Sequence, residues 1–326
     1  MSDLQQQAQS KSTISSMQLI CTSHSPLLLS VTPRDRKSAE DFFTAIEEAH
    51  RDVIAYDPEL IVIFAPDHFN GFFYDVMPPF CVGFQAVGCT DWAIESSSFN
   101  VPEDVALQLA ASVRDEGIDL AISMRMLVDH GFTVPLNLLT KRLNAFPTIP
   151  IFVNCNAPPL PSCRRTRLLG ESVGRFLRKT DKRVLIIGSG GLSHDPPHQP
   201  YERASPELKR HLLGAEAWTP DYELARQARV KKAAQELVNG AGPCLPPNKE
   251  WDRQFLNFLV RQDLSGLDEF TDDWIRRNGG SGGQEIRTWI AAFAALGAAG
   301  KYRARELYYN IVPDWITGMA VYRARV

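Results

Sequence analysis

The chain has 326 residues, of which 44% are hydrophobic and 22% are charged, and these proportions are ordinary for a globular protein. They exclude the disordered and fibrous classes, whose compositions are poorer in apolar residues or strongly repetitive. The formal net charge of −3 gives no overall basic field, so nucleic acid and anionic membrane surfaces are not expected partners.

The N-terminal segment, residues 1–16, is rich in Gln and Ser and lacks the charged and apolar blocks of a secretory signal. We therefore expect a disordered tail there, followed by a single domain over residues 17–326. The longest apolar stretch, residues 289–300, is shorter than the roughly 18 residues that a membrane-spanning helix needs. The six cysteines are scattered without paired spacing, which favours a reducing compartment and predicts a cytoplasmic protein.

Short apolar runs alternate with longer stretches of helical periodicity over the first part of the chain. This alternation predicts an α/β fold with a central, mostly parallel or mixed sheet flanked by helices. The predicted strands are 17–22, 60–64, 120–126, 149–154 and 183–187, and the predicted helices are 38–56, 101–116, 134–143 and 164–179.

The second half of the chain has a different pattern. Residues 201–273 are mainly helical and charged, which predicts helical additions to the fold. A glycine-rich loop at 279–283 then leads into a strongly apolar helix at 284–296, with Glu285 in its first turn. An acidic residue at that position is also favoured by the helix dipole alone.

Four of the seven histidines closely follow the carboxyl end of a predicted strand. In an open parallel sheet these ends lie along one edge, where ligands and catalytic groups collect, and we therefore predict an active site there. A single loop histidine is more often structural or exposed, but four at equivalent positions indicate one shared cleft. Imidazole is suited both to metal ligation and to proton transfer near neutral pH. The four residues are His24, His68, His130 and His194.

A metal site built on histidines also needs a carboxylate. Two imidazoles and one carboxylate on one face of Fe(II) leave three open positions, enough for a chelating diol and dioxygen. Composition cannot select the acid, because Asp and Glu together number 38. Asp67 and Asp129, each directly before a histidine, are candidates as ligands or as groups that hydrogen-bond to a ligating histidine and orient its ring nitrogen.

Six segments of the sequence resemble the class III extradiol ring-cleaving dioxygenases. The resemblance covers nearly all of residues 17–326, which implies one catalytic domain, and it is greatest to the group that acts on 2,3-dihydroxyphenylpropionate. The segments are SHSP at 23–26, FAPDHFNGFFYDVMPPF at 64–80, VDHGF at 128–132, GSGGLSHDPP at 188–197, WDRQF at 251–255 and EIRTWIAAFAA at 285–295.

The resemblance implies a particular site and reaction. Fe(II) is expected on His24, His68 and Glu285, with His194 taking a proton from the catechol and His130 acting as the acid. The expected substrates are O2 with 3-(2,3-dihydroxyphenyl)propionate or 2,3-dihydroxycinnamate, in the catabolism of aromatic compounds. The family also implies a homo-oligomer, such as a tetramer.

Two other functions use the same residues. A zinc hydrolase could employ the same three ligands, although the second pair of histidines and the absence of an HExxH motif argue against it. A non-catalytic binding relative of the fold would be expected to have gaps in the metal triad, and here all three positions are filled. The residue that binds the substrate carboxylate is not indicated, because the chain has 35 Lys and Arg residues.

Overall fold

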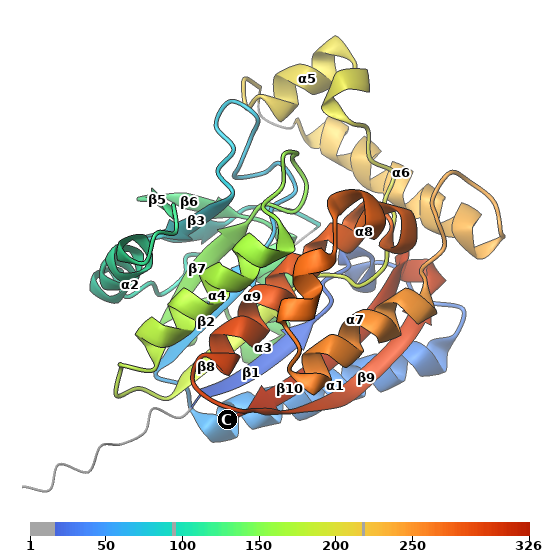
Figure 1. Ribbon diagram of the computed structural model, residues 1–326. Coiled ribbons are helices and arrows are strands. Elements are labelled where there is room, and N and C mark those ends of the chain that lie inside the picture. Colours follow the sequence, from blue (N-terminus) through green and yellow to red (C-terminus); the bar gives the residue numbers. More distant parts are fainter. Residues whose placement is uncertain (1–16, 93–95, 217–218) are drawn as a thin grey trace, which may run out of the picture.

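The computed structural model describes residues 17–92, 96–216 and 219–326. At its centre is an eight-stranded mixed sheet with the order β5-β3-β7-β2-β8-β1-β10-β9 (Figure 1), and the predicted α/β class is confirmed. A separate parallel pair joins β4 to β6. The strands are β1 (Met17–Thr22), β2 (Leu60–Ala65), β3 (Phe80–Gly83), β4 (Ala86–Gly88), β5 (Ala121–Ser123), β6 (Met126–Val128), β7 (Thr148–Val153), β8 (Val184–Ser189), β9 (Arg303–Val312) and β10 (Thr317–Arg325).

Four neighbouring strands at the centre of the sheet, β7, β2, β8 and β1, run parallel. Successive residues of β1 point to opposite faces, and Leu19 and Ile20 pack into different halves of the core. Both faces are buried, which is why these strands read as continuous apolar runs in the sequence. Their carboxyl ends therefore meet at one edge of the sheet.

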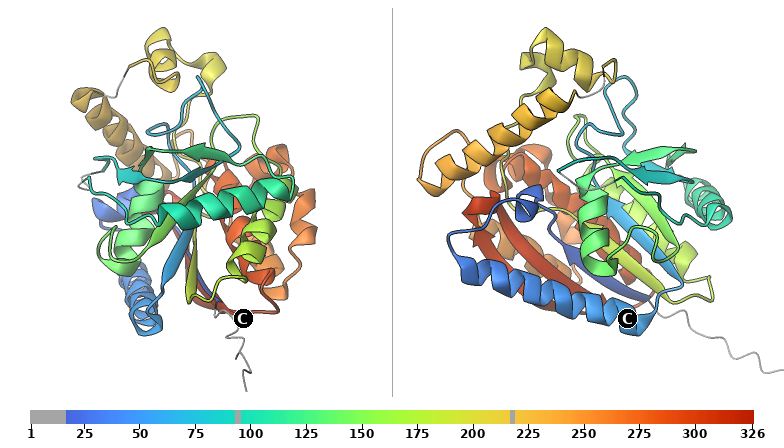
Figure 2. Two further views of the ribbon diagram at one scale, coloured as in Figure 1. Left: turned by 90° about the vertical axis from the view of Figure 1, so that its left-hand side faces the viewer. Right: turned by 180° about the vertical axis from the view of Figure 1, so that it is seen from behind.

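Helices cover both faces of the sheet (Figure 2). On one face lie α4 and α9, with α7 over β9, while α1 and α3 pack on the other face. The α5 and α6 helices lie beyond the carboxyl ends of the parallel strands (Figure 1). The helices are α1 (Arg36–Tyr56), α2 (Glu103–Asp115), α3 (His130–Thr140), α4 (Cys163–Leu177), α5 (Pro206–Leu212), α6 (Pro220–Val238), α7 (Lys249–Arg261), α8 (Asp272–Gly279) and α9 (Ile286–Gly297).

The contact between α4 and α9 depends on two glycines one helical turn apart. A Cβ atom at Gly170 would lie 2.1 Å from the carbonyl oxygen of Ala291, and one at Gly174 would lie 2.1 Å from that of Ala295. The two helix backbones can approach only because both side chains are absent. This packing holds α9 against β8 and β1 and so fixes the position of Glu285, which directly precedes the helix.

Two predicted elements differ from the structure, one strand in its organisation and one helix in its bounds. The strand predicted at 120–126 is divided between β5, at the edge of the main sheet, and β6, in the small sheet. The helix predicted at 134–143 begins four residues earlier at His130, because the side chain of Asp129 caps it by accepting the N–H of Gly131.

The prediction also missed the antiparallel β9–β10 hairpin, in which β10 pairs with β1. The tail predicted at 1–16 lies outside the described residues. Within the described parts of the chain, no helix combines the length and apolar character needed to cross a membrane.

Candidate metal centre and active site

The predicted site residues come together at the carboxyl edge of the parallel strands. His24, His68 and His194 follow β1, β2 and β8, as the sequence predicted. His130 reaches the same place from a different element, because it follows β6 of the small sheet and opens α3. Glu285 ends the 3-10 turn at Gly282–Glu285 that leads into α9.

The carboxylate of Glu285 lies at the centre of this group and is buried. Its Oε2 is 3.4 Å from Nε2 of His24, and its Oε1 is 3.2 Å from Nε2 of His68 and 3.5 Å from Nε2 of His194. The backbone N–H of Gly191 donates to Oε2 at 2.8 Å. Burial by itself would raise the pKa of Glu285, but the surrounding imidazoles lower it well below its usual value, so the group is ionised.

His24 presents an unprotonated nitrogen to that carboxylate. The hydroxyl of Ser189 donates to the carbonyl oxygen of Gly131, so its oxygen is free to accept from Nδ1 of His24 at 2.8 Å. The ring proton of His24 is therefore on Nδ1, and burial lowers the pKa of this histidine to about 3. The lone pair of its Nε2 consequently faces Oε2 of Glu285. Because both atoms are acceptors and cannot hydrogen-bond to each other, a cation bound between them would satisfy both.

His68 is oriented in the same manner. Both its backbone N–H and its Nδ1–H donate to Oδ2 of Asp129, at 2.7 and 3.0 Å, and Nδ2 of Asn70 donates to the same oxygen. Nε2 of His68 is thus directed at Glu285. Two imidazole nitrogens and one carboxylate converging on a point form a donor set that fits Fe(II).

His130 lies beside the other two histidines. Its ring stacks on that of His68 with 4.1 Å between centroids and 21° between planes. One donor nitrogen from each of His24, His68 and His130 lies within 4.8 Å of the other two, so distance alone would also allow His130 as a ligand. Its Nδ1, however, donates a short hydrogen bond to the buried Asp91. Burial opposes ionisation of Asp91, but the ion pair with His130 lowers its pKa overall.

Asp91 was missed by the sequence prediction. It lies in the segment after β4 and is separated from its partner by 39 residues. It neither follows a strand of the main sheet nor adjoins a histidine in the sequence, so no local pattern marks it.

His194 is held by the loop that supplies Glu285. Its backbone N–H donates to the oxygen of Gly279, and its carbonyl accepts from the N–H of Gly282. Its Nδ1–H donates to the carbonyl oxygen of Leu192 at 3.0 Å, which leaves Nε2 facing the site. The carboxylate of Glu285 and the ring of His194 are therefore positioned by one hydrogen-bonded unit.

The two aspartates proposed from the sequence have different surroundings. Asp129 contacts both the backbone and the ring of His68, as described above. The carboxylate of Asp67 instead accepts from the backbone N–H groups of Asn70, Gly71 and Phe72, and among the described contacts it meets no histidine ring. Burial and the neighbouring Asp129 raise the pKa of Asp67 to about 8. Asp67 thus stabilises the turn after His68, and the structure does not support a role for it in orienting a ring.

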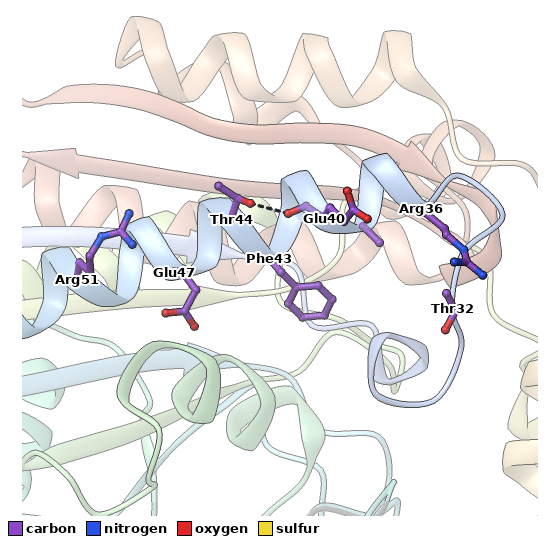
Figure 3. A pocket seen from close by; sticks show the side chains of 8 residues that line it. Thr32, Arg36, Glu40, Phe43, Thr44, Glu47 and Arg51 are labelled. Carbon is purple, nitrogen blue, oxygen red and sulfur yellow. Dashed lines mark hydrogen bonds between the residues drawn. The ribbon is translucent and has the colours of Figure 1, made fainter.

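A surface hollow of about 850 Å³ lies along α1, away from this cluster (Figure 3). It is lined by charged and apolar side chains, among them Arg36, Glu40, Phe43 and Arg51. None of the site histidines lines it, so we give it no part in the chemistry.

Comparison with known proteins identifies the class that this fold and site define. The family description "catalytic LigB subunit of aromatic ring-opening dioxygenase" matches residues 18–320. The chain therefore belongs to the LigB family of aromatic ring-opening dioxygenases, and the class expected from the sequence is confirmed.

Several relatives in this family carry the same name, 2,3-dihydroxyphenylpropionate/2,3-dihydroxicinnamic acid 1,2-dioxygenase. The chain is 48% identical to that of Photorhabdus laumondii, over 95% of this chain and 97% of the relative. It is 48% identical to that of Cupriavidus pinatubonensis, over 94% and 98%. It is 44% identical to that of Rhodococcus jostii, over 93% and 96%.

Proposed function

We propose that this protein is an Fe(II)-dependent extradiol dioxygenase that uses O2 to open the ring of 3-(2,3-dihydroxyphenyl)propionate and of 2,3-dihydroxycinnamate. The names of its relatives support the substrate class, because these relatives match almost the full chain. The reaction belongs to the catabolism of aromatic compounds.

The observation that carries the proposal is the lone pair of His24 opposed to the ionised Glu285. Nε2 of His24 faces Oε2 of this carboxylate while the Nδ1 proton is donated to Ser189, and Nε2 of His68 is directed at Oε1 of the same carboxylate. These three side chains would hold Fe(II). Bound iron would supply open positions for both catechol oxygens and for O2, and it would make the catechol hydroxyls more acidic.

His194 is suited to accept the proton released by the catechol. Its Nδ1–H is held by the carbonyl oxygen of Leu192, so the neutral ring offers Nε2 as a base. That nitrogen lies 3.5 Å from Glu285, at the edge of the proposed metal site. A catechol hydroxyl bound there would be within its reach.

His130 is suited to donate a proton. Its Nδ1 is held by the carboxylate of Asp91, and Oδ2 of Asp129 lies 4.0 Å from the same nitrogen, so Nε2 is the nitrogen left for proton transfer. Among the contacts of the described residues, Glu285 meets His24, His68 and His194 and not His130, which is why we assign His130 to acid catalysis and not to the ligand set.

We further propose one catalytic domain over residues 17–326 and a homo-oligomeric, cytoplasmic enzyme. Side chains from positions 24 to 285 contribute to the one site, which supports the single domain. All six cysteines are free thiols and five are buried, which supports a reducing compartment.

The experiment starts from protein purified without oxygen and loaded with Fe(II). Adding a panel of catechols and then oxygen should give oxygen uptake and a yellow semialdehyde product, with the propionate-bearing catechol turned over better than catechol itself. Zinc-loaded protein that cleaves esters without consuming oxygen would favour a hydrolase and contradict the proposal.

Ligands and acid–base residues can be separated by substitution. His24→Gln, His68→Gln and Glu285→Gln should lose iron, whereas His130→Gln and His194→Gln should keep it and lose on the order of 10²-fold or more in kcat. Stoichiometric iron in all three ligand variants, or full activity in both acid–base variants, would be incompatible with these assignments.

A further inference from the structure

We propose that Asp91 is the positioning residue for His130 and that Arg226 of α6 holds Asp91 in place. The inference deepens the proposed function, because it rests on His130 acting as the acid. Neither Asp91 nor Arg226 belongs to the motifs that resemble the family.

Asp91 contacts His130 twice through the same oxygen. Its Oδ2 accepts a short hydrogen bond from Nδ1 of the ring and lies 3.4 Å from the backbone N–H of the same residue. An ionised carboxylate can only accept, so the ring must carry a proton on Nδ1. Nε2 is then the nitrogen left to exchange a proton with substrate, and it lies on the ring edge opposite the carboxylate.

The second oxygen of Asp91 is occupied from another part of the fold. Nη2 of Arg226 lies 3.4 Å from Oδ1, and the guanidinium is itself held by Glu223 through Nε at 2.8 Å and Nη2 at 3.1 Å. With a partner on each oxygen, the carboxylate cannot rotate away from His130. A series of hydrogen bonds thus connects α6, which lies outside the sheet, to the active site. It runs from Glu223 through Arg226 and Asp91 to His130.

Asp91 shares with Asp129 a direct contact to an imidazole ring, and both differ in this from the buried Asp67 and Asp252. Asp67 accepts three backbone N–H groups, and Asp252 accepts the backbone and hydroxyl of Ser193 and the hydroxyl of Tyr309. Those two acids stabilise loops. The hydrogen bonds that place Asp91 go to His130 and Arg226, which is the arrangement of an acid that orients an imidazole.

The first test reads the tautomer directly and needs neither iron nor turnover. Histidine labelled with 15N in the metal-free protein reports which ring nitrogen bears the proton, and His130→Gln assigns the signal. We expect His130 to be protonated at Nδ1 with a strongly hydrogen-bonded proton, and this proton signal should be lost in Asp91→Asn. A wild-type ring protonated at Nε2 alone, or an unchanged signal in Asp91→Asn, would overturn the proposal.

The second test uses kinetics of the iron-loaded enzyme. Asp91→Asn should lower kcat on the order of 10²-fold while iron content and KM for the catechol stay unchanged, because an amide can donate to Nδ1 and favour the other tautomer. Asp91→Glu should recover part of the loss, since it restores a carboxylate. Asp41→Asn, an exposed acid on α1, is the matched control and should behave as wild type.

Arg226→Gln tests the contact between Arg226 and Asp91, and it remains informative if Asp91→Asn does not fold. It should lower kcat less than Asp91→Asn and broaden or shift the His130 proton signal. Unchanged kcat and an unchanged signal would overturn the role of Arg226. If the iron-loaded wild type turns over no catechol, the proposed function fails, whereas the tautomer measurement still decides whether Asp91 orients His130.

Discussion

The α-carbon of Gly282 lies directly against the imidazole of His194, so that a Cβ atom at this position would be 2.0 Å from Nε2. Gly191 is almost as close, because a Cβ there would be 2.6 Å from Nδ1 of the same ring. The ring is confined by two residues that have no side chains. Its Nε2 is consequently fixed beside Glu285, where the proposed base must act.

Replacing Gly282 with alanine should therefore impair catalysis more than folding. The added methyl group must displace the ring of His194 or the loop that carries Glu285, and we expect kcat to fall on the order of 10²-fold. Oxygen uptake by the iron-loaded variant measures this. Gly297→Ala is the matched control, because a Cβ there would meet its nearest neighbour at an ordinary 3.6 Å, and that variant should keep wild-type activity.

Removing the hydroxyl of Ser189 should weaken iron binding. Ser189→Ala leaves Nδ1 of His24 without its acceptor at 2.8 Å, so the ring is no longer fixed with Nε2 toward Glu285. Loss of such an orienting group costs about 10- to 100-fold in metal affinity. Anaerobic Fe(II) titration measures the change, with the exposed Ser265→Ala as control. Equal affinity in Ser189→Ala and wild type would show that His24 needs no orientation by this hydroxyl.

Gly174→Ala should destabilise the protein although alanine favours helix. Alanine gains about 1 kcal/mol in helix propensity over glycine. Here its Cβ would lie 2.1 Å from the carbonyl oxygen of Ala295, and overpacking of this kind costs about 1–3 kcal/mol or more. We expect a lower urea midpoint for Gly174→Ala and no loss for Gly297→Ala. A variant more stable than wild type would mean that α4 and α9 can separate at little cost.

Asp252 should make the stability of the protein depend on pH. Burial raises the pKa of this acid from 3.8 to about 6 in the folded protein. The folded state therefore binds the proton more tightly than the unfolded state, and stability falls as pH rises from about 4 through 6. The total effect is about 3 kcal/mol at most, of which about 1 kcal/mol falls between about pH 5 and 8.

Asp252→Asn removes that ionisation and should flatten the pH dependence. The amide oxygen can still accept from the N–H of Ser193, and the amide nitrogen can donate to the hydroxyls of Ser193 and Tyr309. Urea unfolding of the metal-free protein at about pH 5 and at about pH 8 measures the change in the free energy of unfolding. The same slope in wild type and Asp252→Asn would contradict a raised pKa at this position.

Much of the fold and part of the site were predictable from local patterns. The strands preceding His24, His68 and His194 are short apolar runs buried on both faces, and their carboxyl ends share an edge for topological reasons. The prediction grouped His130 with His24 and His68, as the structure does, but for an incorrect reason. Within the described parts of the chain, its strand, β6, pairs with β4 and lies outside the main sheet. The two strands within 120–128 could not be separated because both are three residues long.

The partners of the site residues could not be predicted in this way. No local sequence pattern marks Asp91, and its partner Arg226 is 135 residues away along the chain. Glu285 was indicated only by the family resemblance, since any of 38 acidic residues could have been the carboxylate. The β9–β10 hairpin was missed, although β10 completes the sheet beside β1.

The sequence by itself determined which chemical groups the protein has and, through apolar periodicity, which of them follow strands. The tertiary structure alone decided which carboxylate faces which imidazole and on which nitrogen each ring carries its proton. The physical reason is that a hydrogen bond acts over about 3 Å, whereas the partners here are far apart along the chain: Ser189 is 165 residues from His24, and Glu285 is 217 residues from His68. Only the packing of helices such as α9 onto the sheet brings such groups within that range.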